Sequence, residues 1–211
     1  MNLSPVVRFG WVGGELCLDF ANTISEHGPP IADKLLSFAH LVRWAEQAGV
    51  VESLEADEIL QRAARTPEEG GQTLATAIEL RETVYRLFVA LAKGQAPEQN
   101  DLSRLNEFLA RWPVTIQVAA RPGGELRRVY RVGQRPDASL LAPVARSAAE
   151  LLANAELSVR IRQCCAPDCE WLFLDLSKNR SRRWCSMDDC GDRAKAQRYY
   201  HRHKAKSVAK T

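Results

Sequence analysis

The sequence of 211 residues contains no apolar run long enough to cross a membrane, since a membrane-spanning helix needs roughly 18–20 consecutive apolar residues. Residues 1–14 also lack the basic segment, apolar run and small-residue cleavage site of a secretory signal. We therefore expect a cytoplasmic protein that has no membrane partner. Thiols stay reduced in that compartment, so clustered cysteines there are more often metal ligands than disulfides.

The sequence also lacks the common patterns of catalytic sites. It has no phosphate-binding glycine loop, no nucleophile elbow and no metal-catalytic motif. Cys17 lies between Leu16 and Leu18, which favours a buried, unreactive thiol, and no histidine motif accompanies it as a base. We therefore expect no catalytic residues and no enzymatic activity. The absence of repeats of 20–50 residues argues against a solenoid.

What the chain does contain is an uneven distribution of charge. Hydrophobic residues make up 45% and charged residues 26%, which is typical of globular proteins. The net charge is +3, but residues 160–211 hold 13 basic and 6 acidic residues, whereas residues 1–159 hold 16 basic and 20 acidic ones. We therefore expect two units, 1–158 and 159–211, that face different partners.

The spacing of apolar residues predicts that the first unit is mainly α-helical. Apolar positions recur at threes and fours over 33–48, 54–65, 72–93, 97–111 and 138–157. Two β-prone runs, 114–118 and 126–132, are separated by a Pro-Gly-Gly turn and predict one small β-hairpin. Trp11 and Trp44 are expected in the core, and the conformation of residues 9–23 stays open.

Five of the six cysteines lie between residues 164 and 190. Four of them form two pairs with four residues inside each pair and fifteen between the pairs: Cys164 and Cys169, then Cys185 and Cys190. Two such knuckles can supply the tetrahedral thiolate ligands of one Zn²⁺ ion. A shell of four thiolates leaves no open position, so we expect a structural zinc whose binding is coupled to folding. Cys165 could replace Cys164 as a ligand, although the equal spacing favours Cys164.

The cysteine segment resembles the CGNR zinc-finger family of bacteria. The resemblance rests on a dense pattern, Cys164-x4-Cys169-Glu-Trp171-Leu-Phe173-Leu-Asp175-x-Ser177-x-Asn179-x-x-Arg182-Arg183-Trp184-Cys185-Ser-Met187-x-x-Cys190-Gly191-Asp192-Arg193-x-Lys195. Upstream, the run from Leu16 to Thr23 (LCLDFANT) and the Arg81-Glu82 pair resemble the ABATE domain that accompanies this finger.

The resemblance implies a stress-induced transcription regulator. Its N-terminal domain would be a mainly α-helical sensor, and its finger would bind DNA with Cys164, Cys169, Cys185 and Cys190 as zinc ligands. We expect the finger to be treble-clef-like and to end in a basic helix. Asp192 stands where the family's name motif has asparagine; aspartate keeps a helix N-cap but would repel a nearby phosphate.

Basic residues in the second unit favour nucleic acid as the partner. Lys195, Tyr199, Arg202 and Lys206 fall on one face of a helix beginning at residue 192, and such a stripe can neutralise phosphates. A solvated charged face, RNA or an acidic protein are the alternatives. The predicted nucleic-acid-binding residues are Lys178, Arg180, Arg182, Arg183, Arg193, Lys195, Arg198, Arg202 and Lys206.

Three polar residues of the first unit lie in otherwise apolar runs: Asp19, Asn22 and Arg81. Buried polar groups need partners, so these residues either line a pocket for a small-molecule effector or act as internal caps and a buried ion pair. The first possibility belongs to a regulator that senses a ligand or forms a homodimer. The alternative function is a small-molecule-binding or enzymatic N-terminal domain whose finger is an RNA- or protein-interaction module.

Overall fold

The computed structural model describes residues 7, 9–25, 32–120, 123–131, 133, 136–197 and 199–200. These residues are mainly α-helical, which confirms the predicted fold class. The helices are α1 (Leu16–Ala21), α2 (Phe38–Gln47), α3 (Ser53–Arg65), α4 (Pro67–Ala92), α5 (Gln99–Arg111), α6 (Pro136–Ala153) and α7 (Ala155–Ser158), followed by the short π-helix η1 (Met187–Gly191). Residues 192–197 and 199–200 continue from η1 as α-helix.

The strands of the described chain form three two-stranded antiparallel sheets. In each sheet a strand pairs with the next strand along the chain: β1 (Ile24–Ser25) with β2 (Ala32–Asp33), β3 (Thr115–Ala120) with β4 (Leu126–Arg131), and β5 (Ile161–Gln163) with β6 (Leu172–Leu174). The β3–β4 pair confirms the predicted hairpin, which carries exposed side chains along β3.

Helix α4 is the central element of the bundle. It has 26 residues and packs against α1, α2, α3, α5, α6 and both strands of the β5–β6 hairpin. The sequence predicts a break at Gly70-Gly71, but the helix begins earlier, at Pro67, and includes both glycines. A Cβ atom at Gly70 would lie 3.3 Å from Cγ of Phe38. Glycine therefore serves here to let α2 pack closely against α4.

Two other predicted helices have different bounds in the structure. The helix expected over 33–48 begins only at Phe38, because Asp33 belongs to β2 and its carboxylate accepts a hydrogen bond from the Leu35 backbone N–H at 2.8 Å. The helix expected over 138–157 is interrupted at Asn154. The Asn154 side chain accepts hydrogen bonds from two backbone N–H groups and starts α7 as its N-cap.

The hydrophobic core lies between α1, α2, α4 and α6. Trp44 is fully buried, as predicted, and its ring centroid lies 4.7 Å from that of Phe20. The prediction for Trp11 is wrong, since this residue is 44% exposed. Cys17 is fully buried, and burial raises the pKa of its thiol to about 12. This agrees with the predicted unreactive thiol.

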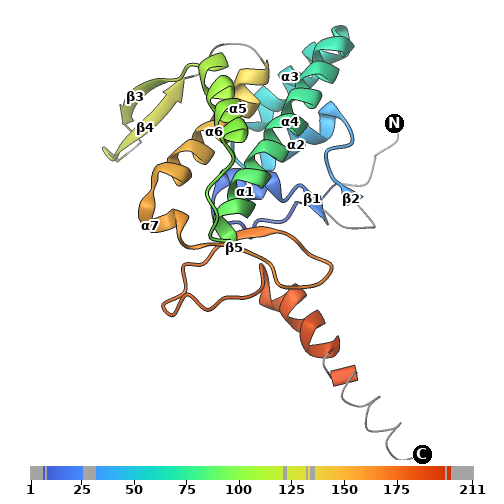
Figure 1. Cartoon of the computed structure of the whole chain (residues 1–211). Coiled ribbons are helices and arrows are strands. Elements are labelled where there is room, and N and C mark those ends of the chain that lie inside the picture. The colour runs from blue at the N-terminus through green and yellow to red at the C-terminus, as the bar shows by residue number, and fades with distance from the viewer. Residues whose placement is uncertain are drawn as a thin grey trace, which may run out of the picture.

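The core extends into the second unit of the chain. Ile161, Leu172 and Leu174 of the β5–β6 hairpin are buried in the same cluster as the helices of the first unit, whereas the cysteines and Phe173 form a smaller cluster. Figure 1 shows β5 beneath the bundle and the final helix, in red, projecting away from it. Among the described residues, no helix is long and apolar enough to span a membrane.

Candidate metal centre

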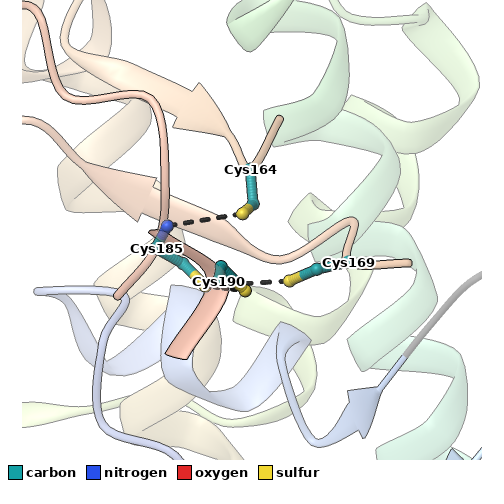
Figure 2. A group of neighbouring side chains, drawn as sticks. All are labelled: Cys164, Cys169, Cys185 and Cys190. Atoms are coloured by element: carbon teal, nitrogen blue, oxygen red, sulfur yellow. Dashed lines mark hydrogen bonds between the residues drawn. The ribbon is translucent and has the colours of Figure 1, made fainter. Parts of the chain in front are cut away.

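Short loops attached to the β5–β6 hairpin and to η1 bring the four paired cysteines together. Cys164 follows β5, and its backbone N–H donates to the Trp171 carbonyl at 2.8 Å, which closes the first knuckle around Cys169. Cys190 lies in η1, and Cys185 precedes it in the second knuckle. Figure 2 shows the four side chains pointing toward one centre.

The spacing of the sulfur atoms fits one tetrahedral zinc ion. All four Sγ atoms lie within 4.8 Å of one another, with Cys169 and Cys185 3.7 Å apart and Cys185 and Cys190 3.6 Å apart. Ligands ~2.3 Å from a tetrahedral centre would lie about 3.8 Å from each other. All four residues are buried, so the centre is closed and suits a structural rather than a catalytic ion.

The electrostatics of the cluster also call for a cation. Hydrogen bonds from Cys169 and Cys185 lower the pKa of the Cys164 thiol well below its ordinary value. The interaction with Cys164 raises the pKa of both Cys169 and Cys185. The protein groups alone thus favour one thiolate and oppose the ionisation of its neighbours. Four thiolates become compatible when Zn²⁺ supplies the compensating charge.

Cys165 is not part of this cluster. Its side chain is exposed and its Sγ lies 4.0 Å from the Gln163 carbonyl oxygen. Its backbone N–H instead donates to the Arg183 carbonyl at 2.9 Å and joins the two knuckles. Of the two alternatives left open by the sequence, the geometry selects Cys164.

Two of the predicted nucleic-acid-binding arginines are engaged inside the finger. Arg182 lies over the Phe173 ring, 4.5 Å from its centroid, and its guanidinium donates to the carbonyls of Trp184, at 2.9 Å, and Cys185. Arg193 donates to Sγ of Cys190 at 3.2 Å. It also forms ion pairs with Asp168 and Asp189. Both arginines therefore support the metal centre.

Other predicted cations are exposed. Lys178, Arg180 and Arg183 lie on the loop between β6 and Cys185, and the Arg183 guanidinium lies 5.5 Å from the centroid of the Trp184 ring. Lys195 is paired with Asp192 at 2.9 Å. Arg198, Arg202 and Lys206 lie outside the described residues.

Asp192 is not the N-cap that the sequence predicts. It has helical backbone angles and follows η1, which begins at Met187 after the extended residue Ser186. The helix therefore starts before Cys190, so that a zinc ligand lies within its first turns. Asp192 compensates the charge of Lys195.

The loop that carries the exposed cations is organised by Asp175, for which the sequence predicts no separate role. Its carboxylate is fully buried and accepts hydrogen bonds from the backbone N–H groups of Ser177 and Arg182, both at 3.0 Å. The Asp-x-Ser pattern is a turn signature that could have identified this function.

Asp19 in α1 and Asn22, the C-cap residue of α1, hold the finger against the helical domain. Asn22 is 2% exposed, and its amide forms two hydrogen bonds with the backbone of Leu172, one to the carbonyl at 2.8 Å and one from the N–H at 2.9 Å. Asp19 accepts from the Gly13 N–H at 2.8 Å, and the Gly13 carbonyl accepts from the Leu174 N–H at 2.8 Å. Both polar groups thus act on β6.

Trp171 adds a second set of contacts between the two units. Its indole N–H donates to the Ile24 carbonyl at 2.8 Å, and Lys34 lies 5.2 Å from its ring centroid. The same ring leaves no room for a side chain at Gly10, where a Cβ atom would approach it to 2.7 Å. The first segment of the chain is therefore shaped to the finger.

Arg81 forms the buried ion pair that was the alternative to a ligand pocket. It is 2% exposed, and its two terminal nitrogens each contact one carboxylate oxygen of Asp33 at 2.8 Å. Its Nε also donates to Glu82 at 3.0 Å. Asp19, Asn22 and Arg81 each have a different protein partner. The hypothesis that they bind an effector stays a prediction.

A helical bundle whose core includes the β5–β6 hairpin beside a four-cysteine zinc centre defines a zinc-finger protein with one structural metal site. Family models match almost the whole chain: ABATE, described as "Putative stress-induced transcription regulator", over residues 14–155, and the CGNR zinc finger over residues 160–203. The chain therefore belongs to the ABATE family and carries a CGNR zinc finger. No protein of curated description matches it.

Proposed function

We propose that this chain is a DNA-binding transcription regulator whose zinc finger contacts duplex DNA and whose helical domain senses a small molecule or mediates dimerisation. The observation that carries the proposal is the cationic loop, residues 176–184, which projects three exposed basic side chains from the zinc centre: Lys178, Arg180 and Arg183. Among the described residues, neither Lys178 nor Arg180 has a carboxylate partner.

The cationic loop is held in one conformation at both ends. Asp175 fixes its start through two backbone hydrogen bonds, and Arg182 fixes its end through the carbonyls of Trp184 and Cys185. A preorganised loop loses little conformational entropy when it binds. Its charges are therefore well suited to contacts with phosphates at fixed spacing.

The helix that follows η1 gives a second surface beside the cationic loop. Its start is tied to the metal through Cys190, and the loop ends at Cys185, so one zinc ion sets the positions of both. Tyr199 and Tyr200 on this helix are each 62% exposed. Aromatic side chains beside cations suit a nucleic-acid surface, where phosphate contacts supply affinity and side chains reach the groove.

Fluorescence anisotropy with labelled duplex DNA tests the proposal. We expect salt-sensitive binding of the zinc-loaded chain, since each neutralised phosphate contributes about 0.9 to the slope of log K against log salt. The double variant Lys178→Gln, Arg180→Gly should bind about tenfold or more weakly at low salt, with a slope smaller by about 2. The control variant Arg65→Gln, Lys93→Gln removes the same charge from the helical domain and should bind normally.

Arg180→Gly is chosen because it should leave the finger folded. Arg180 has a φ of +49°, in the left-handed region that costs a non-glycine residue roughly 1–2 kcal/mol, so glycine relieves this strain while it removes the charge. Zinc content measured on both double variants confirms that the finger is intact. Absence of DNA binding at low salt by the zinc-loaded wild type contradicts the proposal, and preferential competition by RNA reassigns the surface.

A further inference from the structure

We infer that a cavity at the start of α4 is a binding site for a small organic acid with an apolar body. The cavity has a volume of about 380 Å³, within the range of about 300–1,000 Å³ typical of ligand sites. Its lining comes from the ends of five helices, α2 to α6, and includes Phe38, Ile59, Arg62, Thr73, Arg111 and Asp137. The zinc ligands do not line it.

One side of the cavity is apolar. Phe38 from the first turn of α2 and Ile59 and Ala63 from α3 form this side. Gly70 packs against the Phe38 ring, and a Cβ at this position would approach the ring to 3.3 Å. A flat or branched hydrocarbon group can therefore rest on Phe38 and Ile59.

A threonine hydroxyl that is unpaired among the described residues belongs to another lining residue of the cavity. Thr73 is only 8% exposed, and within the described chain its hydroxyl makes no hydrogen bond. Two other threonines of α4 do bond to the preceding turn: Thr76 donates to the Gln72 carbonyl at 2.9 Å and Thr83 to the Glu79 carbonyl at 2.8 Å. Because Thr73 lines the cavity and its hydroxyl is unpaired in the described part of the chain, this hydroxyl can donate a hydrogen bond to a ligand oxygen.

Two cations and two carboxylates line the cavity, and one of the cations is unpaired among the described residues. Asp137 is 4% exposed and accepts from Arg111 at 3.1 Å and from the Trp112 indole at 3.2 Å, so its charge is compensated. Glu69 accepts from the Thr66 hydroxyl at 3.3 Å. The Arg62 guanidinium has no partner among the described residues. A carboxylate is the group that a guanidinium binds in a bidentate manner, and the N-terminus of α4 adds a favourable dipole.

The position of the cavity connects it to the finger. Thr73 and Tyr85 lie on the same helix, about 18 Å apart at 1.5 Å per residue. Tyr85 donates to Glu170 at 3.2 Å and accepts from Gln163 at 3.0 Å, both in the finger. A role for the acid as an effector rests on the proposed function, whereas binding of the acid does not.

Ligand-observed NMR with the zinc-loaded full chain tests the site. The probes are benzoate, phenylacetate and indole-3-acetate, each with its uncharged amide. We expect at least one acid to bind about tenfold or more tightly than its amide, and Arg62→Gln to abolish this preference. Thr73→Val, which keeps the shape of the side chain, should weaken binding about threefold or more. Arg65→Gln, one turn away and outside the lining, is the matched control and should bind normally.

Two results would overturn the inference: none of the three acids binds, or the preference for the acid survives in Arg62→Gln. Arg62 and Arg65 are exposed, so their substitution should not unfold the protein. Circular dichroism verifies that all the variants are folded. The DNA titration is a separate measurement. If the acid binds and DNA does not, the proposed DNA-binding function is refuted and the acid site stands. If DNA binds and no acid does, only the acid site is refuted.

Discussion

Asn22 takes the place of a neighbouring strand for β6. Its side-chain amide offers a donor and an acceptor at the spacing of a peptide group, and both bond to the backbone of Leu172. β5 pairs with the other edge of β6, so without Asn22 the backbone N–H and carbonyl of Leu172 would have no partner. One side chain thus joins elements that are 150 residues apart in the sequence.

Asn22→Ala is therefore expected to be strongly destabilising. It leaves a buried N–H and a buried carbonyl unpaired, which should lower the free energy of unfolding by about 2–4 kcal/mol. Urea denaturation of the zinc-loaded chain measures the change. Asn154→Ala is the control, because it removes an exposed helix cap and should cost about 1 kcal/mol. An equal decrease in the free energy of unfolding in the two variants would contradict the role of Asn22 as the partner of the Leu172 backbone.

Asp19 makes the stability depend on pH. Burial raises the pKa of its carboxyl to about 6, above the value of about 4 in an unfolded chain. The folded protein then binds the proton more tightly, so this group lowers stability as pH rises from about 4 through 6. We expect Asp19→Asn to gain stability relative to wild type between pH 5 and pH 7.5, by about 1 kcal/mol after allowance for partial exposure. Urea unfolding of both proteins at both pH values gives the difference in free energy of unfolding between Asp19→Asn and wild type. If this difference is the same at pH 5 and pH 7.5, the raised pKa of Asp19 is refuted.

At the scale of elements, the finger consists of two parts with different support. The β5–β6 hairpin packs in the main core and bonds to Asn22 and Gly13. The cysteine knuckles and η1 form a small separate cluster around the metal. A cluster of this size buries little apolar surface, so it needs the zinc ion for stability, whereas the hairpin does not.

Removal of zinc by a chelator should therefore release only one of these parts. We expect the backbone amides of Cys185 and Gly191 to lose protection from hydrogen exchange. The amides of Leu172 and Leu174 should stay protected, because their acceptors are Asn22, the C-cap residue of α1, and Gly13, which precedes this helix. Hydrogen exchange with and without zinc measures both sets, and Cys185→Ser should give the zinc-free pattern. Loss of protection at all four amides would show that the hairpin also depends on the metal.

At the scale of the whole molecule, the two units of different charge are joined by one hydrophobic core. Ile161 and Leu172 are fully buried and Leu174 is 4% exposed, all in the cluster that contains the helices. Burial of each such side chain contributes roughly 1.5–3 kcal/mol, and domains have a net stability of only about 5–15 kcal/mol. Packing of the β5–β6 hairpin therefore contributes a large part of the free energy of unfolding of the helical unit.

A chain that ends at residue 158 should for this reason lack a cooperative unfolding transition. A chain that ends at residue 176 keeps the hairpin and Asp175 and should retain the transition. Circular dichroism during thermal unfolding compares the two. A full-length-like melting temperature for the shorter chain would show that the helical unit does not need the finger.

Local sequence patterns were sufficient to predict the features that depend on neighbours along the chain. The spacing of the cysteine pairs identified the zinc ligands, and apolar periodicity identified the helices of 54–65 and 97–111, found at Ser53–Arg65 and Gln99–Arg111. These patterns are local because helices repeat every 3.6 residues and knuckles close within a few residues.

The tertiary structure alone decided the features that depend on distant partners. Asp33 lies in β2 and not in the predicted helix, and its carboxylate pairs with Arg81, which is 48 residues away in the sequence. Arg182 and Arg193 belong to the metal centre, although their spacing in the sequence matches that of exposed basic residues. Only the folded chain distinguishes a cation that is engaged with carbonyl or thiolate groups from a cation without such partners, since local sequence gives their charge and not their surroundings.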